Sequence, residues 1–398
     1  MWLLRICIVR GRGFCIIPER FSRVWRRHRR QEEKTMSNLS QAAVEAAIKT
    51  YTDPYLEKDL VSAGCVKNIQ LDGAKVTIDL VIGFPVKGYE AALSAAVGEK
   101  VMGAGAVEVK VNVEQRIISH AAQKGVQHIK GVKNIIAVAS GKGGVGKSTT
   151  SVNLALALAA EGANVAILDA DIYGPSQPRM LGVEDKKPDS VDGQHIEPIM
   201  SHGLQSMSIG YLVDPETPMI WRGPMVTQAL EQLLKETNWR EVDFLVIDLP
   251  PGTGDTQLTL AQKVPVSGAV IVTTPQDIAL LDARKAYKMF EKVEVPVLGV
   301  VENMSIHICS KCGHAEHIFG EGGGKAMAEQ YNIPFLGALP LDIHIREQAD
   351  SGKPTVVADP DGKVAEIYKD IARKVAAKLS LKAKDYSAKF PKIVIQNS

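Results

Sequence analysis

The chain has 398 residues, 45% of them hydrophobic and 23% charged, a composition typical of globular proteins large enough for two domains. The formal net charge of +2 is unevenly spread: residues 1–35 hold ten Lys and Arg against three Asp and Glu, which leaves 37 basic and 42 acidic residues in the rest. That remainder lacks the basic excess of a nucleic-acid-binding protein, and no apolar run approaches the roughly 18 residues of a membrane span. We therefore expect neither nucleic acid nor membrane as a partner.

Residues 1–36 form an arginine-rich extension that we expect to be disordered and without chemistry. Arginine richness and few acids also fit a transit peptide, although the serine richness of that class is missing. Five cysteines in so long a chain are too few for a disulfide framework. Cys65 stands alone and is expected to be a small buried side chain.

Residues 37–117 are predicted to form a small α/β domain. Ser40 is a plausible N-cap for the amphipathic segment SQAAVEAAIKTY, and Asp72-Gly73 is a favoured turn between two alternating strands. A second helix, YEAALSAAVGEKVMG, and a third strand, AVEVKVNVEQ, follow. Residues 118–134 are polar, have little apolar periodicity and are predicted to be a linker.

The apolar run IIAVA from residue 135 is followed by a glycine-rich loop and then by a helical pattern, SVNLALALAAEG. The loop fits G-x-x-x-x-G-K-[ST], in which backbone N–H groups and a helix N-terminus bind phosphates. Lys147 would then reach the β- and γ-phosphates, and the Ser148 hydroxyl would bind Mg²⁺. The loop residues expected to bind nucleotide are Gly141, Lys142, Gly143, Gly144, Val145, Gly146, Lys147, Ser148 and Thr149.

Apolar strands alternate with helical stretches over residues 135–380, before a C-terminal tail at residues 381–398. This alternation predicts an α/β fold with a mostly parallel sheet covered by helices on both faces. Ligands of such sheets bind at the carboxyl ends of the strands, where Asp169, Asp171 and Asp248 are placed. Asp248 ends FLVID and is positioned to hold Mg²⁺, and Gly252 in the following PPGTGD loop could turn its N–H toward the γ-phosphate.

Cys309 and Cys312 form the one closely spaced cysteine pair in the sequence. Two thiolates at this spacing can bind one soft metal centre, but a [4Fe–4S] cluster usually takes four. A twofold dimer would supply four and place one cluster between two chains. Three alternatives are a mononuclear zinc site completed by His314 and His317, a redox dithiol, or two cysteines without a shared role.

The motifs KGGVGKST, DADIYGPS, VIDLPPGTGD, VENMS and CSKC, in this order after the small domain, resemble the Mrp/ApbC family of iron–sulfur cluster carrier ATPases. The family belongs to the MinD/ParA branch of P-loop ATPases. The resemblance implies that Lys142 contacts the partner's nucleotide across a dimer, that Asp171 positions the hydrolytic water, with Asp169 in the outer shell of the metal, and that Asn303 recognises adenine.

The same resemblance implies the cofactors ATP, Mg²⁺ and a [4Fe–4S] cluster bridged by Cys309 and Cys312 of two chains. It implies a cytoplasmic homodimer that receives clusters from scaffold proteins and transfers them to apo iron–sulfur proteins. Residues 37–117 resemble the small domain that accompanies iron–sulfur assembly ATPases, but IGFPVKGY lacks the cysteine of some members, which favours an interaction module over a metal site. The alternative function is a ParA/MinD-like positioning ATPase with a structural zinc site.

Overall fold

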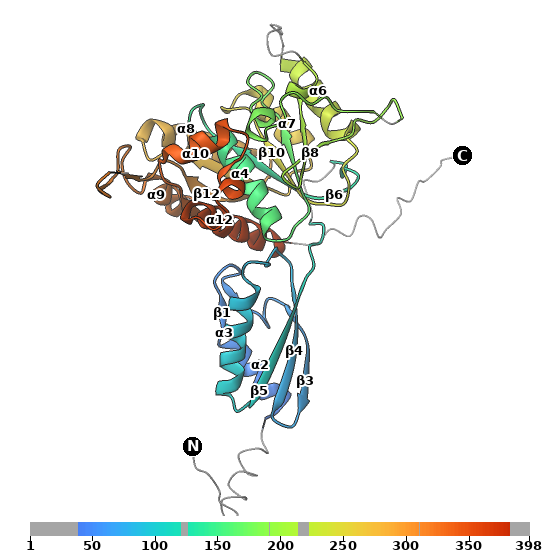
Figure 1. Cartoon of the computed structure of the whole chain (residues 1–398), viewed down its shortest axis with the longest axis vertical. Coiled ribbons are helices and arrows are strands. Elements are labelled where there is room, and N and C mark those ends of the chain that lie inside the picture. The colour runs from blue at the N-terminus through green and yellow to red at the C-terminus, as the bar shows by residue number, and fades with distance from the viewer. Residues whose placement is uncertain (1–38, 121–125, 191, 214–222, 310, 383–398) are drawn as a thin grey trace, which may run out of the picture.

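The computed structural model describes residues 39–120, 126–190, 192–213, 223–309 and 311–382. The arginine-rich extension and residues 383–398 of the predicted tail lie outside these ranges. Figure 1 shows two domains along the long axis of the molecule, a small N-terminal one and a larger one built around a sheet. No helix in the described ranges is both long and apolar enough to span a membrane.

The small domain consists of a three-stranded sheet and two helices. Its elements are α2 (Gln41–Lys49), β1 (Thr52–Asp53), β2 (Lys58–Asp59), β3 (Val66–Asp72), β4 (Lys75–Ile82), α3 (Glu90–Gly103) and β5 (Glu108–Gln115). The predicted hairpin is confirmed, because β3 and β4 pair antiparallel around Gly73, whose φ of 59° suits glycine. The Ser40 side chain caps α2, and Cys65 is buried, both as predicted.

The larger domain contains an eight-stranded sheet in the order β15-β12-β11-β6-β10-β7-β9-β8. Every neighbouring pair is parallel except β8 and β9. Its strands are β6 (Val132–Ala139), β7 (Val165–Asp169), β8 (Ile199–Ser201), β9 (Leu204–Ser208), β10 (Val242–Asp248), β11 (Gly268–Thr273), β12 (Val297–Glu302) and β15 (Phe335–Ala338). The remaining strands, β13 (His307–Ile308) and β14 (Ala315–Glu316), form a separate two-stranded hairpin.

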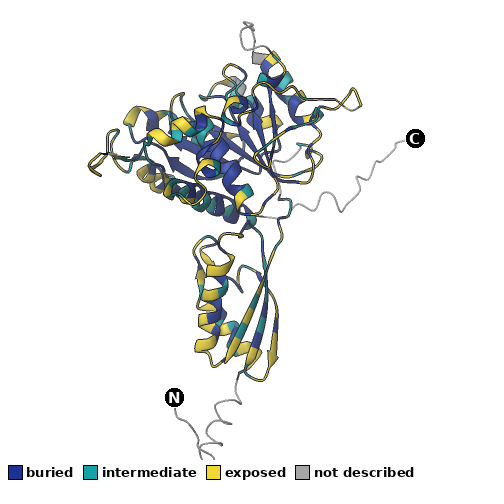
Figure 2. Cartoon of the chain, in the orientation of Figure 1, coloured by how far each residue is buried: buried dark blue, intermediate teal, exposed yellow. Residues whose placement is uncertain are grey.

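The helices of the larger domain follow its strands in the predicted alternation. They are α4 (Lys147–Ala160), α5 (Gln177–Met180), η1 (Ile209–Tyr211), α6 (Gly223–Glu236), α7 (Asp255–Lys263), α8 (Asp277–Lys292), α9 (Gly323–Gln330), α10 (Ile343–Asp350), α11 (Thr355–Ala358) and α12 (Lys363–Ser380). All residues of β10 and β11 are buried. Because successive strand side chains point to opposite faces, both faces of the sheet are covered, as predicted (Figure 2).

Two details differ from the predictions. Strand β6 begins at Val132, inside the predicted linker, because Val132 already pairs with Val242 of β10. The antiparallel β8–β9 hairpin at the sheet edge was not predicted, since its short strands carry too few apolar residues to show a period.

The two domains meet at the C-terminal end of α4. Glu161, the C-cap residue of α4, is only 2% exposed and forms a 2.7 Å ion pair with Arg373 of α12. The small domain contributes the Gly88 N–H, which donates to Glu161 at 3.0 Å, and the Tyr55 hydroxyl, which accepts from Arg373 at 3.2 Å. A buried ion pair with hydrogen bonds from both sides therefore joins the domains.

Candidate nucleotide and cysteine sites

The glycine-rich loop leads directly into α4 and leaves backbone donors open at the helix N-terminus. Gly146 is the N-cap residue, and no side chain caps the helix. Gly144 and Gly146 have φ values of 81° and 83°, a left-handed conformation that turns successive N–H groups into one hollow. Gly143 and Gly144 face open space, since an added Cβ would meet no heavy atom within 4 Å. This loop can hold phosphate groups, as its pattern predicts.

Two other loop glycines are required by close packing. A Cβ on Gly141 would lie 2.1 Å from the backbone carbon of Asp282 in α8. A Cβ on Gly146 would lie 2.1 Å from Nδ2 of Asn303, just after β12. The loop is thus held between α8 on one side and the end of β12 on the other.

Lys147 and Asp248 form a buried ion pair at the centre of the site. Lys147 Nζ lies 2.5 Å from Asp248 Oδ1 and 3.1 Å from Ser148 Oγ. Ser151 donates to the same carboxylate at 2.8 Å, so the fully buried Asp248 has hydrogen-bond partners for its carboxylate. The strand β10 ends at Asp248, which confirms the predicted position of this carboxylate.

Gln177 was missed by the sequence analysis, although it joins three parts of the site. Its side-chain amide donates to Asp248 at 2.9 Å and to the Ser148 carbonyl at 3.1 Å, while its backbone N–H donates to Asp169 at 3.0 Å. Its Oε1 is buried without a hydrogen-bond partner in the described parts of the chain. The residue follows DIYGPS directly, and that proximity to a carboxylate motif was the available signal.

The two carboxylates at the end of β7 lie in different surroundings. Asp169 is fully buried, and both burial and the nearby charge of Asp248 raise the pKa of its carboxyl group. Asp171 is half-buried, and desolvation raises its pKa while the charge of Lys147 lowers it. Asp169 and Asp248 also lie opposite each other in the pairing of β7 with β10, so these two carboxylates are at the same end of the sheet. The role of Asp171 in positioning water remains a prediction.

The donor set of this pocket fits Mg²⁺, which prefers oxygen ligands and keeps several waters. Ser148 supplies a hydroxyl and Asp248 a carboxylate within one hydrogen-bonded cluster around Lys147. The unpartnered carbonyl oxygen of Gln177 is a further buried acceptor beside them. A hydrated magnesium ion would satisfy these acceptors.

The remaining predicted nucleotide residues surround the loop. Lys142 is half-buried and makes no ion pair within the described ranges. The Gly252 N–H donates to the Ser140 carbonyl at 3.0 Å, with a φ of 103°. Asn303 is buried and donates to the Val145 carbonyl at 2.9 Å. In this arrangement Asn303 supports the loop, and its predicted contact with adenine is untested.

The cysteine pair lies on the short β13–β14 hairpin. The turn is closed by hydrogen bonds from the Gly313 N–H to the Cys309 carbonyl and from the Cys309 N–H to the His314 carbonyl. Cys309 is half-buried and Cys312 is exposed, so both thiols can be reached from outside. The backbone N–H groups of Cys312 and Lys311 lower the pKa of the Cys309 thiol, which favours the thiolate that binds metals.

The neighbouring histidines have other contacts. His317 Nδ1 lies 2.7 Å from the Ser305 carbonyl, and His307 Nδ1 lies 3.1 Å from the Leu341 carbonyl. Within the parts of the chain that the structure describes, no group of three or more His, Cys, Asp or Glu side chains could hold a metal ion.

Comparison with known proteins agrees with this arrangement. Residues 131–376 match the family model described as NUBPL iron-transfer P-loop NTPase, and residues 41–113 match the model described as iron–sulfur cluster assembly protein. A solved nucleotide-binding protein from Archaeoglobus fulgidus in complex with ADP is 38% identical, with a TM-score of 0.52, and covers 58% of this chain and 90% of its own.

Three similar proteins have names that concern iron–sulfur clusters. The iron–sulfur cluster carrier proteins of Haemophilus influenzae and Escherichia coli strain K12 are 53% and 52% identical; the matches cover 85% and 88% of this chain, and 92% and 95% of those proteins. The iron–sulfur cluster transfer protein NUBPL of Dictyostelium discoideum is 49% identical over 67% of this chain and 84% of its own length. The chain belongs to the NUBPL iron-transfer P-loop NTPase family.

Proposed function

We propose that this protein is an ATP-hydrolysing iron–sulfur cluster carrier that works as a homodimer. Two Cys309–Cys312 pairs, one from each chain, hold a [4Fe–4S] cluster, which is received from a scaffold protein and passed to apo iron–sulfur proteins. The observation that carries the proposal is the position of the cysteine hairpin. It begins four residues after Asn303, whose side chain supports the nucleotide loop, and it presents two reachable thiols.

The cysteine hairpin supplies half of the ligands that a four-iron cluster needs. Four thiolates usually hold such a cluster, and one chain offers two on this hairpin. Among the described residues, no group of three or more His, Cys, Asp or Glu side chains could hold a metal ion, which favours a cluster shared between chains over zinc bound within one chain. Two-thiolate binding on each side would also leave the cluster open to exchange with another protein.

Each nucleotide-binding residue has a separate role in phosphoryl transfer. Backbone N–H groups of Gly141–Thr149 hold the phosphates, Lys147 neutralises their charge, and Ser148 and Asp248 hold Mg²⁺. Asp171 orients the attacking water, and Lys142 contacts the nucleotide of the partner chain. Hydrolysis is mostly positioning and charge neutralisation, so these groups are sufficient. Free thiols suit the reducing cytoplasm, where we place the protein.

The test is anaerobic reconstitution with iron and sulfide, followed by measurement of iron, sulfide and zinc per dimer. We expect about four iron and four sulfide per dimer, lost in the Cys309→Ala/Cys312→Ala variant and kept in Cys65→Ala. Cys65 is the matched control because it is buried in the small domain. One zinc per chain without sulfide would contradict the carrier function and favour the positioning ATPase with a structural zinc site.

The dimer is tested separately by sedimentation with a non-hydrolysable ATP analogue. The wild-type chain should form a dimer, and Lys142→Ala should remain monomeric while still binding nucleotide. Lys353→Ala, which removes an exposed lysine elsewhere, is the control. A dimer of unchanged strength in Lys142→Ala would exclude the contact of Lys142 across the interface.

A further inference from the structure

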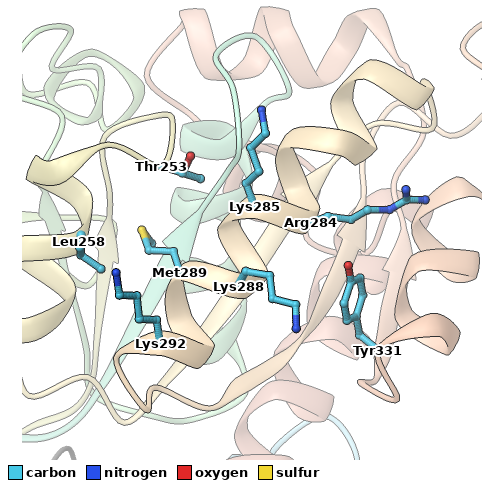
Figure 3. Close-up of a pocket in the computed structure, with 8 residues that line it drawn as sticks. All are labelled: Thr253, Leu258, Arg284, Lys285, Lys288, Met289, Lys292 and Tyr331. Carbon is cyan, nitrogen blue, oxygen red and sulfur yellow. The ribbon is translucent and has the colours of Figure 1, made fainter.

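A hollow beside the nucleotide loop is lined mainly by one side of α8. It has a volume of about 450 Å³. Figure 3 shows Met289 and Lys292 of α8 toward Leu258, and Arg284 and Lys288 toward Tyr331 at the opposite end. The lining residues are Thr253, Leu258, Arg284, Lys285, Lys288, Met289, Lys292 and Tyr331. None of them belongs to the proposed nucleotide or cysteine ligands.

Four cations line the hollow, and two of them are not neutralised. Lys285 pairs with Asp282 and Lys288 pairs with Glu291, at 2.9 and 2.7 Å. Arg284 and Lys292 form no ion pair within the described ranges, and Arg284 Nε is buried there without a hydrogen-bond acceptor. A buried guanidinium nitrogen without an acceptor is costly, so an anion in the hollow would be stabilised.

The hollow also has apolar walls. Met289 is buried, and Leu258 and the Tyr331 ring lie on opposite sides (Figure 3). Tyr331 packs on Tyr287 with ring centroids 4.4 Å apart, and Lys288 Nζ lies 5.5 Å from both ring centres. These contacts hold a cation and an aromatic wall in place before any ligand arrives. A ligand that carries carboxylates next to an apolar side chain would fit both the cations and the apolar walls of this hollow.

The hollow is physically connected to the nucleotide loop. Thr253 belongs to the PPGTGD loop that follows Asp248, and the α8 backbone at Asp282 packs directly against Gly141. An occupant would therefore contact a loop expected to move with the γ-phosphate. By linkage, nucleotide and occupant then change each other's affinity by the same factor.

We infer that this hollow is the docking site for an acidic segment of a partner protein, with carboxylates at Arg284 and Lys292 and an apolar side chain against Leu258 and Met289. Nucleic acid fits less well, because it requires a basic stripe along the surface. Here the cations share one hollow with apolar walls, and the chain after residue 35 carries more acidic than basic residues. The inference does not depend on the cluster.

The experiment uses the full chain and a fluorescent, amidated octapeptide with four carboxylates around one leucine. Its affinity is measured by anisotropy with ADP and with a non-hydrolysable ATP analogue. We expect saturable binding that falls at least about tenfold in Arg284→Gln/Lys292→Gln, since two charge-assisted contacts are lost. The variant Lys353→Gln/Lys363→Gln removes two exposed positive charges elsewhere and should bind like the wild type. Affinity should differ about fivefold or more between the two nucleotides.

Several outcomes would overturn the inference. They are the absence of binding, equal loss in both double variants, and equal binding of a peptide in which amides replace the carboxylates. Competition by duplex DNA at lower concentration than the peptide would assign the hollow to nucleic acid. Loss of the site on ATP-dependent dimerisation would assign it to a second copy of the chain. Equal affinity with both nucleotides would overturn the connection to the nucleotide loop.

Discussion

The nucleotide pocket and the cysteine hairpin differ in how completely one chain builds them. In the pocket, Lys147 and Asp248 are buried and held by Ser151 and Gln177 from two further positions. On the hairpin, the turn between two two-residue strands carries thiols that no disulfide or third metal-binding side chain engages within the described ranges. The buried groups of the nucleotide pocket are therefore in place within one chain. Under the proposed function, the ligand set of the cysteine hairpin is completed only by a second chain, which suits a cluster that has to be released.

Replacing Lys147 should have the largest effect. In Lys147→Ala, ATP hydrolysis should fall at least about 100-fold, because the charge that faces the developing phosphate charge is lost. The free energy of unfolding without nucleotide should fall by about 3 kcal/mol, since Asp248 remains buried without its partner. Turnover assays and urea denaturation measure the two effects, with Lys353→Ala as control. Turnover at the wild-type rate would contradict the assignment of the pocket.

The accessible thiols of the hairpin should differ in reactivity from the buried thiol of Cys65 in the small domain. At pH 7, alkylation of Cys309 in the apo Cys312→Ser variant should be roughly 100-fold faster than alkylation of Cys65. Backbone N–H groups lower the pKa of Cys309, whereas burial raises the pKa of Cys65 to about 11. The rate for Cys309 should reach half its maximum below pH 9, the ordinary thiol value, because the thiolate forms earlier as pH rises.

Mass spectrometry of each cysteine peptide after timed alkylation measures these rates. Equal reactivity of Cys309 and Cys65 in the folded protein would contradict the predicted difference. Denatured protein is the control, since both thiols should then react alike.

Two loop glycines should respond differently to the same change. Gly146→Ala should reduce the free energy of unfolding by about 2 kcal/mol, because its φ of 83° is strained for alanine and its Cβ would meet Asn303. Gly143→Ala should change it by less than about 0.5 kcal/mol, since its Cβ points into open space. Urea denaturation without nucleotide compares them. Equal losses would show that the loop is not held by Asn303.

The smallest effect is expected at the hairpin. Cys309→Ala/Cys312→Ala should change the unfolding free energy of the apo protein by no more than about 0.5 kcal/mol, because both side chains are accessible and touch little. Thermal or urea unfolding of matched apo samples measures this. A loss of several kcal/mol would mean that the cysteines serve the fold rather than a bound cluster.

The strands and the phosphate-binding loop could be predicted because their signals are local. Apolar runs, a glycine pattern and strand-end carboxylates identify β6, β7, β10 and the loop that precedes α4. Gln177 and the β8–β9 hairpin could not be predicted. Gln177 has a common side chain whose importance arises from three partners far away in sequence, and β8 and β9 are too short for a periodic pattern.

The contacts between the two domains could not be predicted from the sequence either. Glu161 and Arg373 are separated by more than two hundred residues, and the sequence around each one indicates only an ordinary charged side chain on the surface. The cationic hollow on α8 was also missed, because lysine and arginine at this spacing are typical of any solvent-exposed helix.

Helix α4 makes functional contacts at both of its ends, because Glu161 connects its C-terminal end to α12 and to the small domain. Its first turn follows the phosphate-binding loop, and its C-cap residue, Glu161, is held by Arg373 and the Gly88 N–H of the small domain. A helix of 14 residues is roughly 21 Å long and stiff. An axial shift of α4 at the phosphate-binding loop would therefore also move the contacts of Glu161 with Arg373 and with the Gly88 N–H of the small domain.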